Sequence, residues 1–185
     1  MILVNDLRSG MTFELDNEVY LVLDKTNNKT ARSKMSIKTK VKDMRSGSIT
    51  ELSWTSGDKV KRAHMDKKEM QYLYDAGEML VFMDTTTYVQ LEISKDRLEW
   101  EINFLKENQL IEIVSYDGEI MGINLPDKIA LKVVETEPAV KGDTATSASK
   151  SATLETGLEV KVPLFIDSDE VILVTTEDGK YSSRA

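Results

Sequence analysis

Residues 171–181 read VILVTTEDGKY, and residues 111–123 read IEIVSYDGEIMGI. Each segment places an Asp-Gly pair between two runs of β-branched and aromatic residues, which is the strongest short-range signal for a β-hairpin. The two glycines, Gly118 and Gly179, are 61 residues apart in the chain (118 to 179). This offset predicts two similar β-structures that follow one another.

Other turn signals, such as Asp16-Asn17 and Ser46-Gly47, recur along the whole chain between short runs rich in Val, Ile, Thr and Tyr. This pattern is typical of small barrels and sandwiches. We therefore predict an all-β protein of three small β-barrels. The expected boundaries are residues 1–63, 64–127 and 128–185, with the last two barrels similar to each other.

Two segments depart from this pattern. Residues 94–106 place Leu98, Ile102 and Leu105 at helical spacing, so we expect a turn or two of helix there. Residues 144–153 are rich in Ser, Thr and Ala and have no large apolar residue, which predicts an exposed loop.

The composition argues against a catalytic function. It contains no cysteine, which removes thiolate nucleophiles and sulfur ligands for zinc. Its single histidine, His64, has no partner set for a metal or for general-base catalysis, and the acidic run Asp167, Asp169 and Glu170 lacks the glycine and spacing of a calcium loop. We expect a structural or linker role for His64, a solvated turn for the acidic run, and no enzyme activity, cofactor or metal.

The apolar runs are too short to cross a membrane. Residues 1–4 lack the basic and long apolar regions of a secretory signal. The expected location is the cytoplasm, with no membrane partner, and the expected state is a monomer.

Charge is distributed unevenly along the chain. The whole chain has a net charge of −8, but residues 1–63 contain 12 basic and 8 acidic residues, whereas residues 64–185 contain 12 basic and 24 acidic residues. Residues 25–45 alone hold eight Lys or Arg and one acid, Asp43. Because phosphate binding needs clustered cations, this stretch is the candidate RNA-contacting segment.

Residues 34–42, KMSIKTKVK, alternate between two faces: one carries Met35, Ile37, Thr39 and Val41, and the other carries Lys34, Ser36, Lys38, Lys40 and Lys42. The pattern predicts a half-buried strand with a lysine face, on which neighbouring lysines stand about 6.6 Å apart, a spacing that suits a phosphate backbone. The alternative is an edge strand whose lysines prevent aggregation. Residues 26–33 contain no large apolar residue, so they should form a projecting hairpin tip with Lys29 and Arg32. The basic positions of the stem and tip, apart from Arg32, are Lys29, Lys34, Lys38, Lys40 and Lys42.

Several motifs resemble the bacterial translation elongation factor P family. Residues 132–184 are similar almost residue by residue to that family's C-terminal signature, and they include LETGLEVKVPLF and EDGKYSSR. Further matches are VNDLRSG (residues 4–10), MQYLY (70–74), VFMD (81–84) and NFLKEN (103–108). The resemblance extends over the whole chain.

The resemblance implies an SH3-like (KOW-type) N-terminal barrel followed by two OB-fold barrels, arranged as an L with the outline of a tRNA. It also implies binding to the 70S ribosome between the peptidyl and exit sites, where the first barrel's hairpin tip reaches peptidyl-tRNA. Family members stimulate peptide-bond formation and relieve stalling at consecutive prolines. The implied mechanism is positional, and the ribosome performs the reaction.

In the family, the tip residue is a lysine or arginine that often carries a modification, and the matching position is Arg32. The arginine class, whose guanidinium a modifying enzyme can rhamnosylate, typically reads Ser-Gly-Arg-Asn, whereas this chain has Ala31 and Ser33 beside the arginine. Both a modified and a bare Arg32 remain open, because a bare guanidinium also offers several donors to phosphate and ribose oxygens.

In the last barrel, Gly142, Asp143 and Thr144 match a family loop, and the resemblance implies that this loop contacts the exit-site codon of the mRNA or the small subunit; an ordinary β-turn is the alternative. The alternative function for the whole chain is general binding of single-stranded RNA on the OB-fold faces. The acidic balance of residues 64–185 argues against that function.

Overall fold

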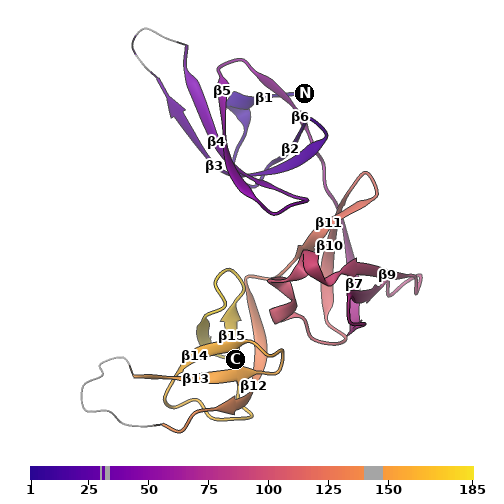
Figure 1. Cartoon of the computed structure of the whole chain (residues 1–185), viewed down its shortest axis with the longest axis vertical. Helices are drawn as coiled ribbons and strands as arrows, with labels where there is room; N and C mark the ends of the chain where they lie inside the picture. Colours follow the sequence, from indigo (N-terminus) through magenta and orange to yellow (C-terminus); the bar gives the residue numbers. More distant parts are fainter. Residues whose placement is uncertain (30, 32–33, 140–147) are drawn as a thin grey trace. The chain divides into compact units, whose positions relative to one another are not determined.

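The computed structural model describes residues 1–29, 31, 34–139 and 148–185. In these residues the regular structure is almost entirely β-strand, and the strands form three sheets (Figure 1). The prediction of an all-β protein with three β-units is therefore confirmed.

The first sheet has the strand order β1-β6-β2-β3-β4-β5. Its elements are β1 (Ile2–Leu3), the 3-10 helix η1 (Val4–Asp6), β2 (Thr12–Leu15), β3 (Glu18–Asn28), β4 (Ser36–Asp43), β5 (Ile49–Thr55) and β6 (Lys59–Arg62). Phe13 is fully buried in its core, and its ring centroid lies 5.6 Å from that of Tyr20 and 5.9 Å from that of Trp54. These aromatic contacts join β2, β3 and β5 around one core.

The second and third sheets have the same topology. Their orders are β11-β10-β7-β8-β9 and β14-β13-β12-β15-β16. In each sheet the strand that comes first in the chain is central, and it lies between the strands that come second and fourth in the chain. The strands of the second sheet are β7 (Asp66–Asp75), β8 (Met79–Met83), β9 (Gln90–Ser94), β10 (Leu110–Tyr116) and β11 (Glu119–Asn124). Those of the third are β12 (Lys128–Thr136), β13 (Ser149–Leu154), β14 (Glu159–Pro163), β15 (Val171–Thr175) and β16 (Tyr181–Arg184).

The two Asp-Gly hairpins occupy equivalent places in these sheets. Asp117-Gly118 alone joins β10 to β11, and Asp178-Gly179 lies in the connection of residues 176–180 between β15 and β16. In each case these are the fourth and fifth strands of the sheet in chain order. Asp117 and Gly118 have φ values of 48° and 79°, the left-handed backbone that a two-residue hairpin turn requires. The repeat predicted from the 61-residue offset (118 to 179) is confirmed as a repeat of strand order.

The predicted helical segment forms two short 3-10 helices, η2 (Lys95–Leu98) and η3 (Glu101–Phe104). Leu98 and Phe104 are fully buried, and Phe104 joins the core of the third sheet. The indole N–H of Trp100 donates to the carbonyl of Thr176 at 2.8 Å. The position of the predicted helical segment is thus correct, and its helices are of the tighter 3-10 type. Trp100 and Phe104 lie against Gly179 in the turn before β16.

The predicted loop over residues 144–153 is wrong at its C-terminal end. Residues 149–154 form β13, which pairs with both β12 and β14. Lys150, Ala152 and Leu154 alternate inward along it. The small side chains of this strand hid the alternation, and residues 144–147 lie outside the described residues.

Contacts divide the chain into two compact units, residues 1–67 with 114–122 and residues 68–113 with 123–185. The β10–β11 turn therefore belongs with the first sheet. Met121 packs in one cluster with Val19 and Ala63, and the Tyr116 hydroxyl donates to Glu14 at 2.7 Å.

We predict unequal stability losses for two substitutions at equivalent hairpin glycines. An added Cβ at Gly179 would lie 3.1 Å from Cη2 of Trp100, whereas nothing lies within 4 Å at Gly118. Both glycines have positive φ, so Gly118→Ala should cost about 1 kcal/mol in the free energy of unfolding. Gly179→Ala should cost roughly 1 kcal/mol more, because Trp100 must move. Urea denaturation followed by circular dichroism measures both, and equal losses would contradict the Trp100 contact.

Candidate RNA-contacting hairpin

The candidate site is the hairpin of β3 and β4. The two strands pair from Tyr20↔Asp43 to Asn28↔Ser36, with one irregularity between Val22 and Asp24. β4 also pairs along its length with β5, from Ser36↔Thr55 to Lys42↔Ile49. Because β4 has a hydrogen-bonded neighbour on each side, its backbone is fixed and its side chains have a defined direction.

The predicted two-faced pattern of β4 is confirmed. Ile37, Thr39 and Val41 have no exposed surface. The opposite face carries lysines: Lys34 (which precedes the strand), Lys38 and Lys40 are exposed, and Lys42 is partly buried. The Thr39 hydroxyl accepts the indole N–H of Trp54 at 2.9 Å, so the one polar side chain on the inner face is satisfied.

Lys38 is paired within the sheet. Its ammonium donates to Glu51 on β5 at 2.9 Å, and this hydrogen bond raises the pKa of Lys38. Both side chains are about half exposed, at 46% and 56%, so the ion pair is a weak one that solvent screens. The sequence did not reveal this pair, because the β4–β5 register places Glu51 opposite Lys40 and diagonally across from Lys38.

Lys25 also has an internal partner. Its ammonium donates to the backbone carbonyl of Asn5 at 2.6 Å. The Asn5 side chain in turn accepts from the N–H of Gly57 and donates to Ser56, at 3.1 Å in each case. Lys25 therefore ties β3 to η1 and, through Asn5, to the β5–β6 turn.

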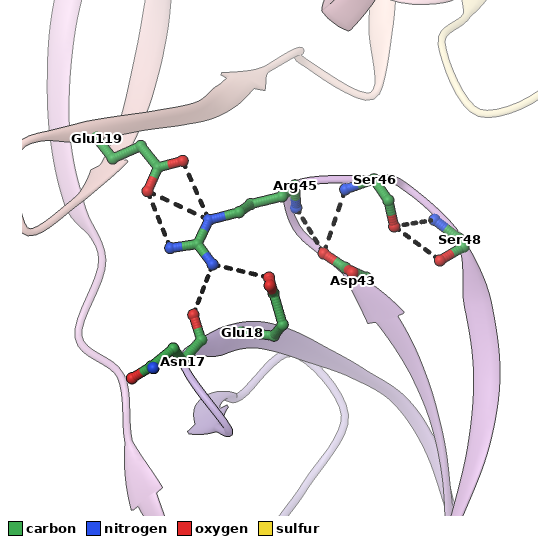
Figure 2. Close-up of polar contacts among 7 residues, drawn as sticks. All are labelled: Asn17, Glu18, Asp43, Arg45, Ser46, Ser48 and Glu119. Atoms are coloured by element: carbon green, nitrogen blue, oxygen red, sulfur yellow. Dashed lines mark hydrogen bonds and ion pairs between the residues drawn. The ribbon is translucent and has the colours of Figure 1, made fainter.

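Arg45, the last residue of the basic stretch, lies in a cluster at the other end of the hairpin (Figure 2). Its guanidinium contacts the Glu18 carboxylate at 2.7 Å, the Asn17 carbonyl at 2.5 Å and the Glu119 carboxylate at 3.0 Å. Hydrogen bonds to Glu119 and Glu18 raise the pKa of Arg45. Arg45 thus connects the β2–β3 turn, the β4–β5 turn and the β10–β11 turn.

Asp43 holds the β4–β5 turn beside Arg45. Burial opposes its ionisation, but backbone N–H groups of Arg45 and Ser46 donate to its carboxylate at 2.8 and 3.2 Å and lower the pKa of Asp43 (Figure 2). The hydroxyls of Ser46 and Ser48 lie 2.7 Å apart within the same turn. The single acid of the basic stretch is therefore structural.

The remaining cations of the hairpin face solvent. Lys29, Lys34 and Lys40 are exposed, and with Lys42 they make no ion pair with any residue that the structure describes. Arg32 lies outside the described residues, between the exposed Ala31 and Lys34. Gly142, Asp143 and Thr144 also lie outside them.

Three family models match consecutive parts of the chain. They describe the elongation factor P KOW-like domain, over residues 3–60, the elongation factor P OB domain, over residues 65–123, and the elongation factor P C-terminal region, over residues 129–184. The chain belongs to the elongation factor P family. It is a translation elongation factor with a KOW-like first domain and an OB second domain, and its third sheet repeats the strand order of the second.

A solved structure of a translation factor shows a related fold. Eukaryotic translation initiation factor 5A from Methanococcus jannaschii is 20% identical, with a TM-score of 0.53 over 66% of this chain and 92% of that chain. A translation initiation factor eif-5a family protein from Naegleria fowleri is 14% identical, with a TM-score of 0.48 over 67% of this chain and 96% of that chain. At 20% identity, the first similarity shows the fold alone.

Among the other candidate residues, one is exposed and two have ion-pair partners. His64 is exposed, Asp169 lies 3.4 Å from Lys132, and Glu170 lies 3.3 Å from Arg184. Within the described ranges, no group of three or more His, Cys, Asp or Glu side chains could hold a metal ion. No helix in the described part of the chain is long and apolar enough to span a membrane.

We predict that Arg45→Gln loosens the β10–β11 turn from the first sheet. Glutamine cannot reach Glu18, Asn17 and Glu119 together, so amide hydrogen exchange of residues 114–122 should become faster. The β4–β5 turn should keep its protection, because Asp43 accepts from backbone N–H groups there. Lys40→Gln is the matched control and should leave both segments unchanged. Unchanged exchange in residues 114–122 of Arg45→Gln would contradict the role assigned to Arg45.

Proposed function

We propose that this translation elongation factor binds the 70S ribosome between the peptidyl and exit tRNA sites and positions peptidyl-tRNA for peptide-bond formation. In this proposal the factor relieves stalling at consecutive prolines. Arg32 contacts the acceptor end of peptidyl-tRNA near the peptidyl-transferase centre, and the exposed lysines of the β3–β4 hairpin contact the RNA around it. The proposal rests on family membership and on the direction of the lysines.

The main support for the proposal is that β4 has one buried apolar face and one exposed lysine face. Its inner residues, Ile37 and Val41, are fully buried, so the lysine face cannot rotate away from solvent. Neighbouring lysines on a strand face stand about 6.6 Å apart, which matches contact with successive phosphates of a nucleic acid backbone. Edge protection alone does not account for this face, because β4 is paired on both sides.

The proposed mechanism is positional. Holding two reactants in the productive geometry lowers the entropic part of the barrier, and a paired hairpin is a rigid support for such a contact. The ribosome would perform the reaction, and the factor would supply no catalytic group or cofactor. Arg32 would act through its guanidinium, which donates several hydrogen bonds to phosphate or ribose oxygens, either bare or after a modifying enzyme has extended it.

The remaining expectations belong to the same proposal. Gly142, Asp143 and Thr144 would contact mRNA at the exit site or the small subunit. The three domains would divide at residues 63/64 and 127/128. The factor would act as a monomer in the cytoplasm.

A reconstituted translation assay on an mRNA that encodes consecutive prolines tests the proposal. The wild-type protein should relieve the stall, and Arg32→Ala should lose most of this effect. Arg62→Ala is the matched control, because Arg62 is an exposed arginine on β6 of the same sheet. It should behave as wild type.

Two outcomes would contradict the proposal. If neither the wild type nor Arg32→Ala changes the stall, the central claim fails. Tight binding to free single-stranded RNA with a steep salt dependence would instead support the general RNA-binding alternative. The intact mass of a peptide that spans Arg32, from protein made in its native host, distinguishes a bare from a modified arginine.

A further inference from the structure

The connection between β8 and β9 exposes two apolar side chains together. Tyr88 is 72% exposed and Val89 is 63% exposed; among the described large hydrophobic residues only Met1 is more exposed. The connection leads into β9 at the edge of the second sheet (Figure 1). Neighbouring exposed apolar side chains of this size mark an interaction site more often than single ones do.

Asp84 fixes the conformation of this connection. Its side chain is 8% exposed, and its carboxylate accepts the N–H groups of Thr86 and Thr87 at 2.8 and 3.3 Å. The backbone of Asp84 closes the turn, because Tyr88 donates to its carbonyl at 2.8 Å and its own N–H donates to Val89 at 3.0 Å. Lys68 on β7 neutralises the carboxylate at 2.6 Å. Hydrogen bonds to Asp84 therefore hold Thr86, Thr87, Tyr88 and Val89 in this connection.

Tyr88 has a backbone that a tyrosine rarely adopts. Its φ is 61°, in the left-handed region, which costs about 1 kcal/mol or more for a residue with a bulky side chain. A glycine would remove this cost, and the exposed ring makes little packing contact that would offset it. A large exposed side chain kept at a strained position indicates that the ring has a role outside the fold.

The net charge of residues 64–127, which include Tyr88 and Val89, indicates the charge of the expected partner. Residues 64–127 contain five Lys or Arg and fourteen Asp or Glu. A field of this sign repels RNA phosphates and attracts a basic surface. Tyrosine is also among the residues that most often anchor protein interfaces, because its ring buries a large apolar area at little cost in conformational entropy.

We propose that Tyr88 and Val89 form a protein-docking anchor, which inserts into an apolar pocket on a basic protein. This inference rests on the proposed function in one respect: the partner is a protein component of the ribosome. Asp84 is a positioning residue for the anchor, since it holds the turn that presents the ring. Val89 would pack at the rim of the same pocket.

Equilibrium binding to salt-washed 70S ribosomes tests the anchor. Tyr88→Ser should bind at least tenfold more weakly than the wild type, as loss of an interface anchor does. Tyr74→Ser removes another exposed tyrosine, 47% exposed on β7 of the same sheet, and should bind within twofold of the wild type. Equal affinities of Tyr88→Ser and the wild type would overturn the inference. Failure of the wild type itself to bind would instead overturn the proposed function.

Tyr88→Gly separates binding from folding. Glycine adopts a φ of 61° without strain, so this variant should melt at or above the wild-type temperature while it binds as weakly as Tyr88→Ser. A variant that melts normally and binds normally would contradict the anchor.

Crosslinking identifies the chemistry of the partner. With Tyr88 replaced by p-benzoylphenylalanine, irradiation on the ribosome should attach the factor to one ribosomal protein of net positive charge. Attachment to ribosomal RNA, or to an acidic protein, would overturn the assignment of a basic protein partner.

Discussion

The burial of Ile37, Thr39 and Val41 beneath β4 is the constraint on which the candidate site depends. Side chains of a strand alternate between its two faces, so a shift of one residue in register would bring the lysines into the core. Thr39 strengthens this constraint, because its hydroxyl accepts the Trp54 indole N–H. An apolar inner face thus determines the direction of a basic outer face. The lysines of the hairpin point to solvent because the opposite face of the strand is buried in the core.

The cations of the hairpin divide into two groups by what they contact. Lys25 and Arg45 hold parts of the first unit together, and Lys38 is paired with Glu51 on the surface. The exposed lysines near the tip have no such partner among the described residues. Three of the eight basic residues in residues 25–45 therefore have partners within the fold. The acidic residues 64–185 add a second electrostatic feature, which favours a basic partner.

Sequence patterns predicted those parts of the fold that local periodicity determines. The β4 alternation and both Asp-Gly hairpins were predicted because each depends on neighbouring residues only. The partners of Arg45 and Lys25 were not, because Glu119 is 74 residues away and Asn5 is 20 residues away. β13 was missed because its inward residues include Lys150 and Ala152, which lack the bulk that marks a buried strand face. The strained Tyr88 was missed as well, since backbone angles leave no signal in a turn without glycine.

The central claim is that the paired hairpin holds its tip at peptidyl-tRNA on the ribosome. The chain has no cysteine, so Ala31→Cys introduces a unique thiol at an exposed residue beside Arg32. An iron chelate tethered there generates hydroxyl radicals that cleave nearby RNA. With the factor bound to a ribosome stalled on consecutive prolines, the account predicts strong cleavage of peptidyl-tRNA at its acceptor end. Cleavage confined to other RNA, or no cleavage of the tRNA at all, would contradict it.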